Sequence, residues 1–546
     1  MSHPSAQAQR LWAQARKQIR QPQHPRLAQL AIAYFEQALA LETHNVDLML
    51  DFAEAYARLG HKEKAIALCE RALRIAPQSL RAQWALTLCQ IPPLYETPQE
   101  IEASRAAYAA HLTRFAAQLD LSSSEKIAAA ADALSYGLPF YLAHQAQNDV
   151  ALQRVYGAMQ HRVFTARYPK YAAPPRVPSP SPQEPVRVGI VADEFRNHSV
   201  WKVILDGWVT QLHPARIALY GYYTGERADK ETQVARAHCR KFVHAKLELR
   251  AWAETIRADR LHVLIYSAIG MAGMPSRLAA LHLAPVQCVA TGHALTSGLP
   301  SMDYCLSGAA SETEHADAYY TEQLVRLPNL GIYYQEQRVE LADKPRAAFG
   351  LRDSAIVYFM PHALFKFLPQ YDFIFPTIAR AVGDCQFVFL QNKHAATLTR
   401  QFEKRVAHAF ANAGMDARQY VVTQPRLNRS DYQTLQHHAD IYLDSLGYGG
   451  MTATLETLAH NLPIVTRRGE SYRNNFSAAL LHRINVTETL TATLDEYVAR
   501  AIRLGTDPAW RADVRAKIAA HKHLAYHDHD AIEGLEIFLA QRARGH

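Results

Sequence analysis

The chain has 546 residues, of which 49% are hydrophobic and 20% charged, and this composition predicts a globular protein with about two to four domains. It contains neither a run of about eighteen apolar residues nor an apolar signal core at the start, so we expect no transmembrane helix, no membrane insertion and no cleaved export signal. The net charge of +8 is dispersed, without a basic stripe interleaved with aromatic residues, which disfavours nucleic-acid binding.

Histidines and cysteines form no metal-binding pattern. The 27 histidines include no His-Glu-x-x-His motif, and the six cysteines lack the close pairs of a zinc ribbon. Scattered cysteines of this kind are typical of reduced thiols, so we expect a cytoplasmic protein with no metal requirement.

The N-terminal region is predicted to consist of helical repeats. Residues 46–79 place Ala53 and Tyr56 in a first helix, Gly60 at a turn and Pro77 at the end, which is the tetratricopeptide pattern. A generic helical hairpin is the alternative. So few repeats make a poor isolated solenoid, so we expect them to dock on a later part of the chain. Their apolar positions recur after 34 residues, with Ala31, Phe35 and Ala38 matched by Ala65, Cys69 and Ala72.

A proline-rich segment marks the clearest domain boundary. Helical patterning continues to residue 170, and residues 171–185 then contain six prolines, which cannot sustain a helix or a central strand. Short apolar runs alternate with helical stretches after this linker, and this alternation predicts two doubly wound α/β domains. The predicted strands are 186–191, 217–222, 263–266, 286–290, 355–359, 386–390, 420–423, 441–443 and 464–466.

A glycine-rich turn between two of these strands is the most informative motif. Gly447, Gly449 and Gly450 permit close backbone approach and positive φ. Thr452 is a candidate N-cap for a helix that would direct its N–H groups at an anion, and Glu456 falls one turn later, within reach of a sugar hydroxyl. No P-loop lysine follows the glycines, so the turn favours a nucleotide sugar over a bare phosphate. An ordinary strand-to-helix turn is the alternative.

Eight further segments, together with this turn, resemble the bacterial O-linked N-acetylglucosamine transferase family in its SPINDLY-like branch. The likeness extends over nearly the whole chain, and its ordered matches are specific as a set. The segments are 91–102, 140–145, 188–198, 283–288, 292–298, 302–304, 320–329 and 364–366.

The resemblance implies an inverting GT-B glycosyltransferase, whose two Rossmann-like domains follow an all-α tetratricopeptide-like domain. The expected segments are helical repeats at 1–120, a helical connector at 121–170, the linker at 171–185, an acceptor-side domain at 186–345, a nucleotide-sugar domain at 346–525 and a C-terminal helix at 526–546.

The family implies a uridine diphosphate sugar as donor and a Ser or Thr of a protein as acceptor. By position, Lys366 matches the lysine on the donor diphosphate, and His198 matches a histidine near the acceptor that was once favoured as the base. Lys366 could instead be an ordinary surface lysine, and His198 could be a helix cap. Glu456 could be an ordinary acidic residue in the first turn of a helix. The remaining matches are Leu427 and Arg429 beside the uracil, Gly449, Gly450, Met451, Thr452 and Glu456 at the diphosphate and ribose, and His293, Thr296 and Ser297 on the acceptor side.

Departures from the family pattern lie around the donor cleft and put the donor in doubt. Three polar or charged family residues are replaced here, by Met451, Ala268 and Asn475. A proline gives way to Ala294, and residues 467–468 supply two additional arginines. Two alternatives therefore stay open: a related transferase that uses UDP-glucose, GDP-fucose or an Asn acceptor, and a non-catalytic repeat scaffold with a vestigial cleft.

No cofactor is expected beyond the nucleotide sugar itself. The predicted partner is an acceptor protein presented by the repeats, and flagellin or another surface protein modified before export is a candidate.

Overall fold

The computed structural model describes residues 5–19, 25–392 and 395–545. The chain divides into two compact units, each built from two stretches of sequence. Met1–Gln145 combines with Leu341–Ala439, and Ala146–Glu340 combines with Asp440–His546.

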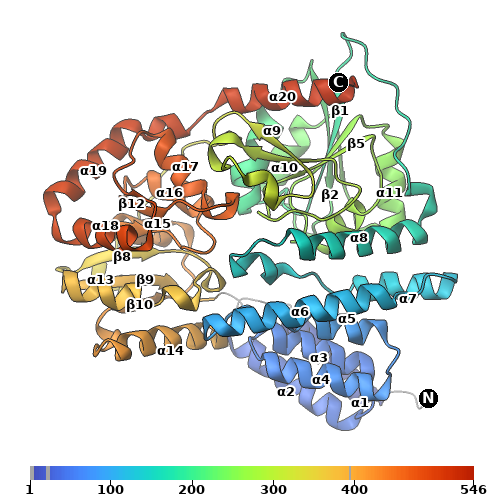
Figure 1. The fold of residues 1–546 in the computed structure, drawn as a ribbon, viewed down its shortest axis with the longest axis horizontal. Helices are drawn as coiled ribbons and strands as arrows, with labels where there is room; N and C mark the ends of the chain where they lie inside the picture. The colour runs from blue at the N-terminus through green and yellow to red at the C-terminus, as the bar shows by residue number, and fades with distance from the viewer. Residues whose placement is uncertain (1–4, 20–24, 393–394, 546) are drawn as a thin grey trace. The chain divides into compact units, whose positions relative to one another are not determined.

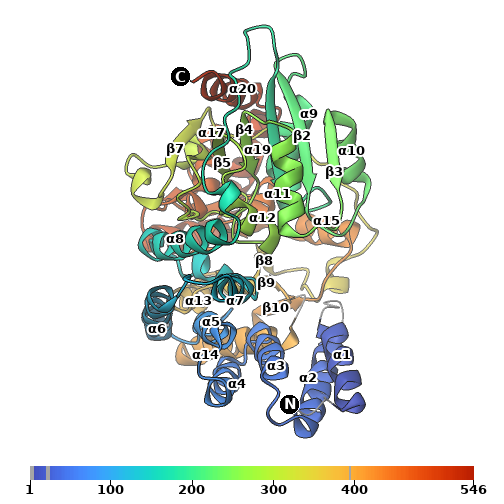
Figure 2. The same cartoon turned by 90° about the vertical axis from the view of Figure 1, so that its right-hand side faces the viewer.

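The first unit begins with antiparallel helices that confirm the predicted repeat (Figure 2). Ala53 and Ala65 are fully buried between two of these helices, where small side chains allow close packing. Gly60 lies in the turn that joins them and has φ of +82°. The helices are α1 (Ala6–Ile19), α2 (Pro25–Leu41), α3 (Val46–Arg58) and α4 (Lys62–Ile75), followed by α5 (Leu80–Leu88), α6 (Pro98–Gln118) and α7 (Ser124–Leu134).

The repeats dock on helix α14 (Ala396–Asn412) of the same unit, as their small number predicts. Leu59, at the turn after α3, packs against Leu398 of α14. The Leu59 carbonyl accepts a hydrogen bond from Thr397 Oγ1 at 2.6 Å, and the Gly60 carbonyl accepts one from Gln401 Nε2 at 3.1 Å. Apolar contact and backbone hydrogen bonds therefore both fix this edge of the repeats.

The second unit begins with the connector helix α8 (Val150–Arg167), and residues 172–185 contain no helix or strand. A seven-stranded parallel sheet comes next, in the order β3-β2-β1-β4-β5-β6-β7. Its strands are β1 (Val186–Ala192), β2 (Ile217–Tyr223), β3 (Lys241–His244), β4 (Val263–Tyr266), β5 (Val286–Ala290), β6 (Tyr304–Gly308) and β7 (Gln323–Leu327).

The strand order of this sheet reverses direction after β3, so right-handed crossovers place the connecting helices on both faces. Figure 1 shows α9 and α10 on one side of the strands and α11 on the other. The helices are the π-helical turn η3 (Trp201–Leu205) with α9 (Asp206–Gln211), α10 (Lys230–His238), α11 (Leu249–Ala258) and α12 (Gly273–Ala279).

Six further parallel strands fall into two groups, three in each unit. In the first unit, β10 (Val421–Gln424), β9 (Cys385–Leu390) and β8 (Ile356–Met360) lie side by side in that order, with helices α13 (Ile374–Val382) and α15 (Arg429–His438). In the second unit, the order is β11 (Ile441–Leu443), β12 (Ile464–Arg467) and β13 (Leu490–Thr491). The prediction of two parallel-sheet, Rossmann-like domains after a helical region is confirmed.

The C-terminal helices complete the second unit. Helix α20 packs on the first sheet, where Glu536 accepts a hydrogen bond from the His213 N–H at 2.6 Å and pairs with Arg216 at 2.9 Å. Among the described residues, none of the helices combines the length and apolar character that a membrane span requires. The helices are α16 (Thr452–Leu458), α17 (Phe476–Arg483), α18 (Leu494–Thr506), α19 (Pro508–His521) and α20 (His529–Ala543).

Replacing Gly60 tests the docking of the repeats on α14. A Cβ at Gly60 would meet Leu398 Cδ2 at 2.5 Å, whereas Gly414, with φ of +71°, has nothing within 4 Å. Left-handed backbone costs a non-glycine residue about 1–2 kcal/mol. We expect Gly414→Ala to lower the free energy of unfolding by about that amount and Gly60→Ala to lower it further, in urea denaturation. Equal losses of unfolding free energy in the two variants would show that the contact between the repeats and α14 adjusts to the added methyl group without destabilisation.

Candidate active site

The first sheet has a topological switch point between β1 and β4, where α/β proteins bind ligands beyond the carboxyl ends of the strands. Glu194 follows β1 and Ser267 follows β4, and Ser267 Oγ donates a hydrogen bond to Glu194 Oε2 at 2.7 Å. Only 3% of Glu194 is exposed, and this burial raises the pKa of its carboxyl to about 7. The hydrogen bond from Ser267 and the cation of Arg196 oppose the rise. The Glu194 carboxyl, which lies at the carboxyl ends of β1 and β4, is therefore near its titration midpoint at neutral pH.

His198 lies four residues later, at the start of the helical run that contains η3. Its Nδ1 accepts a hydrogen bond from the Val200 N–H at 3.2 Å, and its carbonyl accepts one from the Lys202 N–H at 3.0 Å. In a neutral ring, an accepting Nδ1 leaves the proton on Nε2. The ring therefore caps the helix start, and its predicted part in the reaction stays a prediction.

Thr296 and Ser297 are brought together by the buried carboxylate of Glu322, which is 7% exposed. Thr296 Oγ1 donates to Glu322 Oε2 at 2.6 Å, and both the N–H (2.8 Å) and the hydroxyl of Ser297 donate to Oε1. His293, in the same loop, is 3% exposed and lies beside Gly270. These hydrogen bonds tie the predicted acceptor-side loop to Glu322, a residue that the sequence analysis did not single out.

The glycine-rich turn folds around the buried carboxylate of Asp444, which follows β11. Asp444 Oδ1 accepts hydrogen bonds from the N–H groups of Gly450 at 2.7 Å and Ser445 at 3.0 Å, and Oδ2 accepts one from Thr466 Oγ1 at 2.9 Å. A Cβ at Gly449 would lie 2.9 Å from Asp444 Oδ2. The glycines therefore make room for a carboxylate of the protein itself.

Gly449 and Gly450, like Gly447, permit positive φ but do not adopt it in this turn. One local prediction for this turn is wrong. The N-cap of α16 is Met451 and has no side-chain cap bond, and Thr452 is the first helical residue. The helix thus begins one residue earlier than predicted.

Glu456, the predicted ribose contact, is half-buried on α16 and paired with a lysine of the π-helical turn η3. Lys202 Nζ lies 3.1 Å from Glu456 Oε1, and the two side chains are 28% and 17% exposed. The sequence signal for Lys202 is its place four residues after His198, which puts both on one face of a helical turn.

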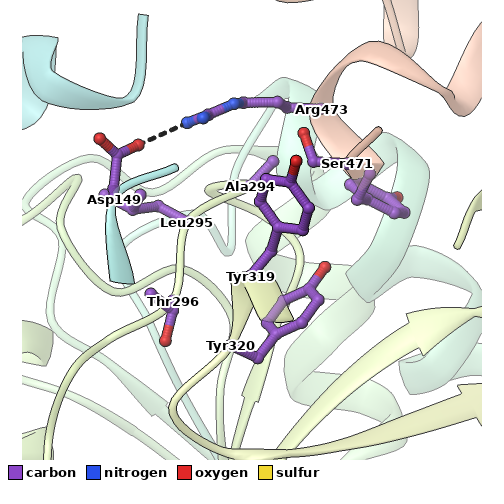
Figure 3. Close-up of a pocket in the computed structure, with 9 residues that line it drawn as sticks. Asp149, Ala294, Leu295, Thr296, Tyr319, Tyr320, Ser471 and Arg473 are labelled. Atoms are coloured by element: carbon purple, nitrogen blue, oxygen red, sulfur yellow. Dashed lines mark hydrogen bonds and ion pairs between the residues drawn. The ribbon is translucent and has the colours of Figure 1, made fainter. Parts of the chain in front are cut away.

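A hollow of about 290 Å³, the part open to solvent included, lies in the second unit. Figure 3 shows an ion pair of Asp149 and Arg473 at one edge and Tyr319 and Tyr320 at the other. Burial raises the pKa of Tyr320 well above its ordinary value. The lining is therefore uncharged overall and rich in tyrosine; its residues are Asp149, Ala294, Leu295, Thr296, Tyr319, Tyr320, Ser471, Tyr472 and Arg473.

Arg473 connects this hollow to the glycine turn. Its Nη1 lies 2.7 Å from Asp149 Oδ2, its Nη2 donates to the Gln147 carbonyl, and its own carbonyl accepts the Gly449 N–H at 2.8 Å. Both charged side chains are at most 5% exposed. The connector before α8 and the glycine turn are therefore held by the same residue.

Three predicted donor residues lie in the first unit. Lys366 is half-buried on a 3₁₀ turn, Leu364–Lys366, after β8. Leu427 is half-buried in the loop after β10, and Arg429 is exposed as the first residue of α15. Asn428 caps α15 by accepting the Asp431 N–H at 2.9 Å, and this bond fixes where the helix begins.

The departures from the family pattern have structural accounts. Tyr472 donates its hydroxyl to the sulfur of Met451 at 3.8 Å, so a thioether faces that tyrosine where the family has a polar side chain. Asn475 is buried and donates to the Ser311 carbonyl at 2.9 Å. Ala268, the second residue after β4, is 1% exposed.

Within residues 5–19, 25–392 and 395–545, no three or more His, Cys, Asp or Glu side chains gather in a way that could hold a metal ion.

The family model of glycosyl transferase family 41 matches residues 137–339 and 335–527, which together span most of the chain. The chain belongs to glycosyl transferase family 41. A tetratricopeptide repeat model matches residues 26–88, in the helices ahead of the family 41 region. The predicted resemblance is thereby confirmed.

Curated relatives of this family 41 chain include two plant proteins named as probable UDP-N-acetylglucosamine–peptide N-acetylglucosaminyltransferase SPINDLY. The protein from Solanum lycopersicum is 24% identical over 362 residues, which are 65% of this chain and 38% of the relative. The protein from Arabidopsis thaliana is 23% identical over 350 residues, which are 63% of this chain and 37% of the relative. The chain thus spans well under half the length of these relatives.

A solved structure of a mutant O-GlcNAc transferase from Thermobaculum terrenum has the same fold. Its TM-score is 0.73 at 19% identity, and the match covers 100% of this chain and 98% of the other. At this identity the likeness concerns the fold alone, and it confirms the predicted GT-B architecture of this family 41 member.

Replacing Asp444 tests whether one carboxylate organises the glycine turn. Asp444→Ala leaves the Gly450 N–H and the Thr466 hydroxyl without their acceptor, and each unsatisfied buried group costs about 1–3 kcal/mol. We expect a loss of at least about 2 kcal/mol in urea denaturation, and faster amide exchange at residues 447–452. Asp444→Asn keeps one acceptor oxygen and should lose less. Unchanged exchange in Asp444→Ala would contradict this role.

The raised pKa of Glu194 makes stability fall as pH rises. The unfolded carboxyl titrates near its ordinary value, so the contribution is fully present below that value and is lost as pH rises through about 7. A shift of this size corresponds to about 3 kcal/mol. We expect the wild type, measured against Glu194→Gln, to lose about that much unfolding free energy between pH 5 and pH 8. Parallel pH profiles of the two proteins would show that the carboxyl is not buried in solution.

Proposed function

We propose that the chain is an inverting protein O-glycosyltransferase that moves N-acetylglucosamine from UDP-GlcNAc to a Ser or Thr hydroxyl of a protein. The observation that carries the proposal is the family 41 match, which spans both Rossmann-like domains. The names of the plant relatives specify this donor and a peptide acceptor, and they support the proposal at low identity.

The donor half of the proposal assigns three residues. The turn of Gly449 and Gly450 approaches the diphosphate, and Glu456 accepts a hydrogen bond from a ribose hydroxyl. A half-buried carboxylate is suited to this, because charged acceptors make stronger hydrogen bonds than neutral ones.

In the reaction, the acceptor hydroxyl attacks the anomeric carbon from the face opposite the diphosphate. The new C–O bond forms as the bond to the diphosphate oxygen breaks, and the hydroxyl proton passes to a base. Lys366 stabilises the charge that develops on the departing UDP, and positioning supplies much of the remaining rate. His198 acts on the acceptor side in this proposal; to accept the proton at Nε2, its ring would have to give up the bond from the Val200 N–H.

The acceptor half of the proposal assigns protein binding to the repeats. Stacked tetratricopeptide helices form surfaces that bind other proteins. The acceptor we propose is flagellin or another surface protein, modified in the cytoplasm before export. Free cysteines fit that compartment, and Cys69, Cys89, Cys288, Cys305 and Cys385 are buried thiols.

A related transferase with a different donor is the second candidate. Met451 offers a thioether in contact with Tyr472, not a polar side chain, at the turn assigned to the diphosphate. Such a change alters what the turn can bind and motivates a screen that includes UDP-glucose and GDP-fucose.

Calorimetric titration tests the proposal directly. Wild-type protein should bind UDP-GlcNAc, and Lys366→Met should raise the Kd at least about tenfold, because a charge-assisted contact to the diphosphate is lost. The matched control is Lys404→Met, which removes an exposed lysine from α14 of the same unit and should leave the Kd unchanged.

The outcomes separate the candidates. Binding of GDP-fucose or UDP-glucose in preference to UDP-GlcNAc would favour the second candidate. A folded protein that binds none of the three nucleotide sugars would favour a repeat scaffold with a vestigial cleft.

A further inference from the structure

Lys202 occupies an unusual place in the fold. It lies on η3, a π-helical turn, four residues after His198. Turns of this kind are rare and are frequent at functional sites. From there its ammonium reaches Glu456 on α16, in the same compact unit, at 3.1 Å.

Stability gives little reason for this ion pair. The two side chains are 28% and 17% exposed, so water still reaches both charges and the loss of one partner strands the other less completely than in a fully buried pair. The fully buried pair of Arg473 and Asp149 is different, because loss of one partner would strand a charge away from water. The position of Lys202 therefore calls for a reason other than folding.

At Met451 the glycine turn has no polar side chain, and Lys202 could supply a charge there. Met451 presents a thioether, and Tyr472 donates to it at 3.8 Å. Along α16, Glu456 lies about 6 Å beyond Thr452, at about 1.5 Å per residue. A lysine side chain is a compact ammonium on a flexible four-carbon stem, so its charge can reach different points over such a distance. The ammonium can thus move from Glu456 to a ligand at the start of the turn.

We propose that Lys202 is a further catalytic residue, which contacts the diphosphate of the nucleotide sugar. Glu456 holds the ammonium beside the turn until the ribose hydroxyl takes its place. The ammonium then neutralises the additional negative charge that the diphosphate gains as its bond to the anomeric carbon breaks. The inference rests on the proposed function and adds Lys202, from the helical run after β1, to the residues assigned to the diphosphate.

Comparing the binding of UDP and of UDP-GlcNAc tests this role, because a general folding defect would weaken the binding of both ligands alike. UDP carries more negative charge than UDP-GlcNAc, so Lys202→Met should weaken UDP binding more than UDP-GlcNAc binding. The rate constant for hydrolysis of saturating UDP-GlcNAc, in which water takes the place of the acceptor hydroxyl and UDP is released, should fall about 100-fold. Lys202→Arg keeps the cation and should recover part of both losses.

A matched control removes a comparable ion pair elsewhere in the first sheet. Lys241, on strand β3, pairs with Asp259 at 2.7 Å. Lys241→Met should change neither the two dissociation constants nor the rate, and circular dichroism should report the same fold for both methionine variants.

The double variant Lys202→Met/Glu456→Gln distinguishes action on the diphosphate from neutralisation of Glu456. If Lys202 acts on the leaving group, the double variant stays at least about tenfold slower than Glu456→Gln alone. If Lys202 only offsets the charge of Glu456, the two rates are equal, and the inference is overturned.

Failure of the inference differs from failure of the proposed function. A wild type that binds UDP-GlcNAc, with a Lys202→Met variant of equal rate and equal affinities, overturns the role of Lys202 and leaves the function standing. A folded wild type that binds neither UDP-GlcNAc nor UDP overturns both.

Discussion

The glycine turn of the second unit depends on the buried carboxylate of Asp444. One side chain accepts hydrogen bonds from the turn and from strand β12, through Gly450 and Thr466. The backbone carbonyl of Asp444 accepts a hydrogen bond from the Tyr497 hydroxyl at 2.7 Å, and this bond joins the turn to α18. A buried carboxylate is tolerated only when such donors replace water. The path of the chain into α16, and hence the place of Glu456, follows from this constraint.

This arrangement explains why sequence reasoning identified the turn and misread its details. The three glycines and the flanking apolar strands are visible in the sequence, and they located the turn between β11 and α16. The group that comes close to Gly449, however, is the carboxylate of Asp444. From the sequence alone, Asp444 is recognisable only as the residue that follows a strand. The start of α16 at Thr452 depends on those hydrogen bonds, so residue propensity alone put the N-cap one position late.

Most interior strands were predictable, although β6 was missed, and among the edge strands β10 was predicted whereas β3, β7 and β13 were not. The runs 263–266, 286–290 and 441–443 coincide with β4, β5 and β11, because strands buried on both faces read as continuous apolar segments. Strand β3 has an exposed lysine at its start, and β13 has two residues, so neither gives that signal. Contacts between distant segments, such as Lys202 with Glu456 and Arg473 with Asp149, depend on topology and leave no local pattern in the sequence.

The two ion pairs of the second unit differ in their bearing on function. The pair of Arg473 and Asp149 is explained by folding, since a half-removed buried pair costs about 3–5 kcal/mol, and a vestigial cleft would keep it for that reason alone. The pair of Lys202 and Glu456 is partly exposed, so folding depends on it less than on the fully buried pair. A cation and a carboxylate that stability does not require, set beside a turn without a polar side chain at Met451, are better explained by a ligand that needs both. The departures around the turn therefore favour an altered binding site over a lost one.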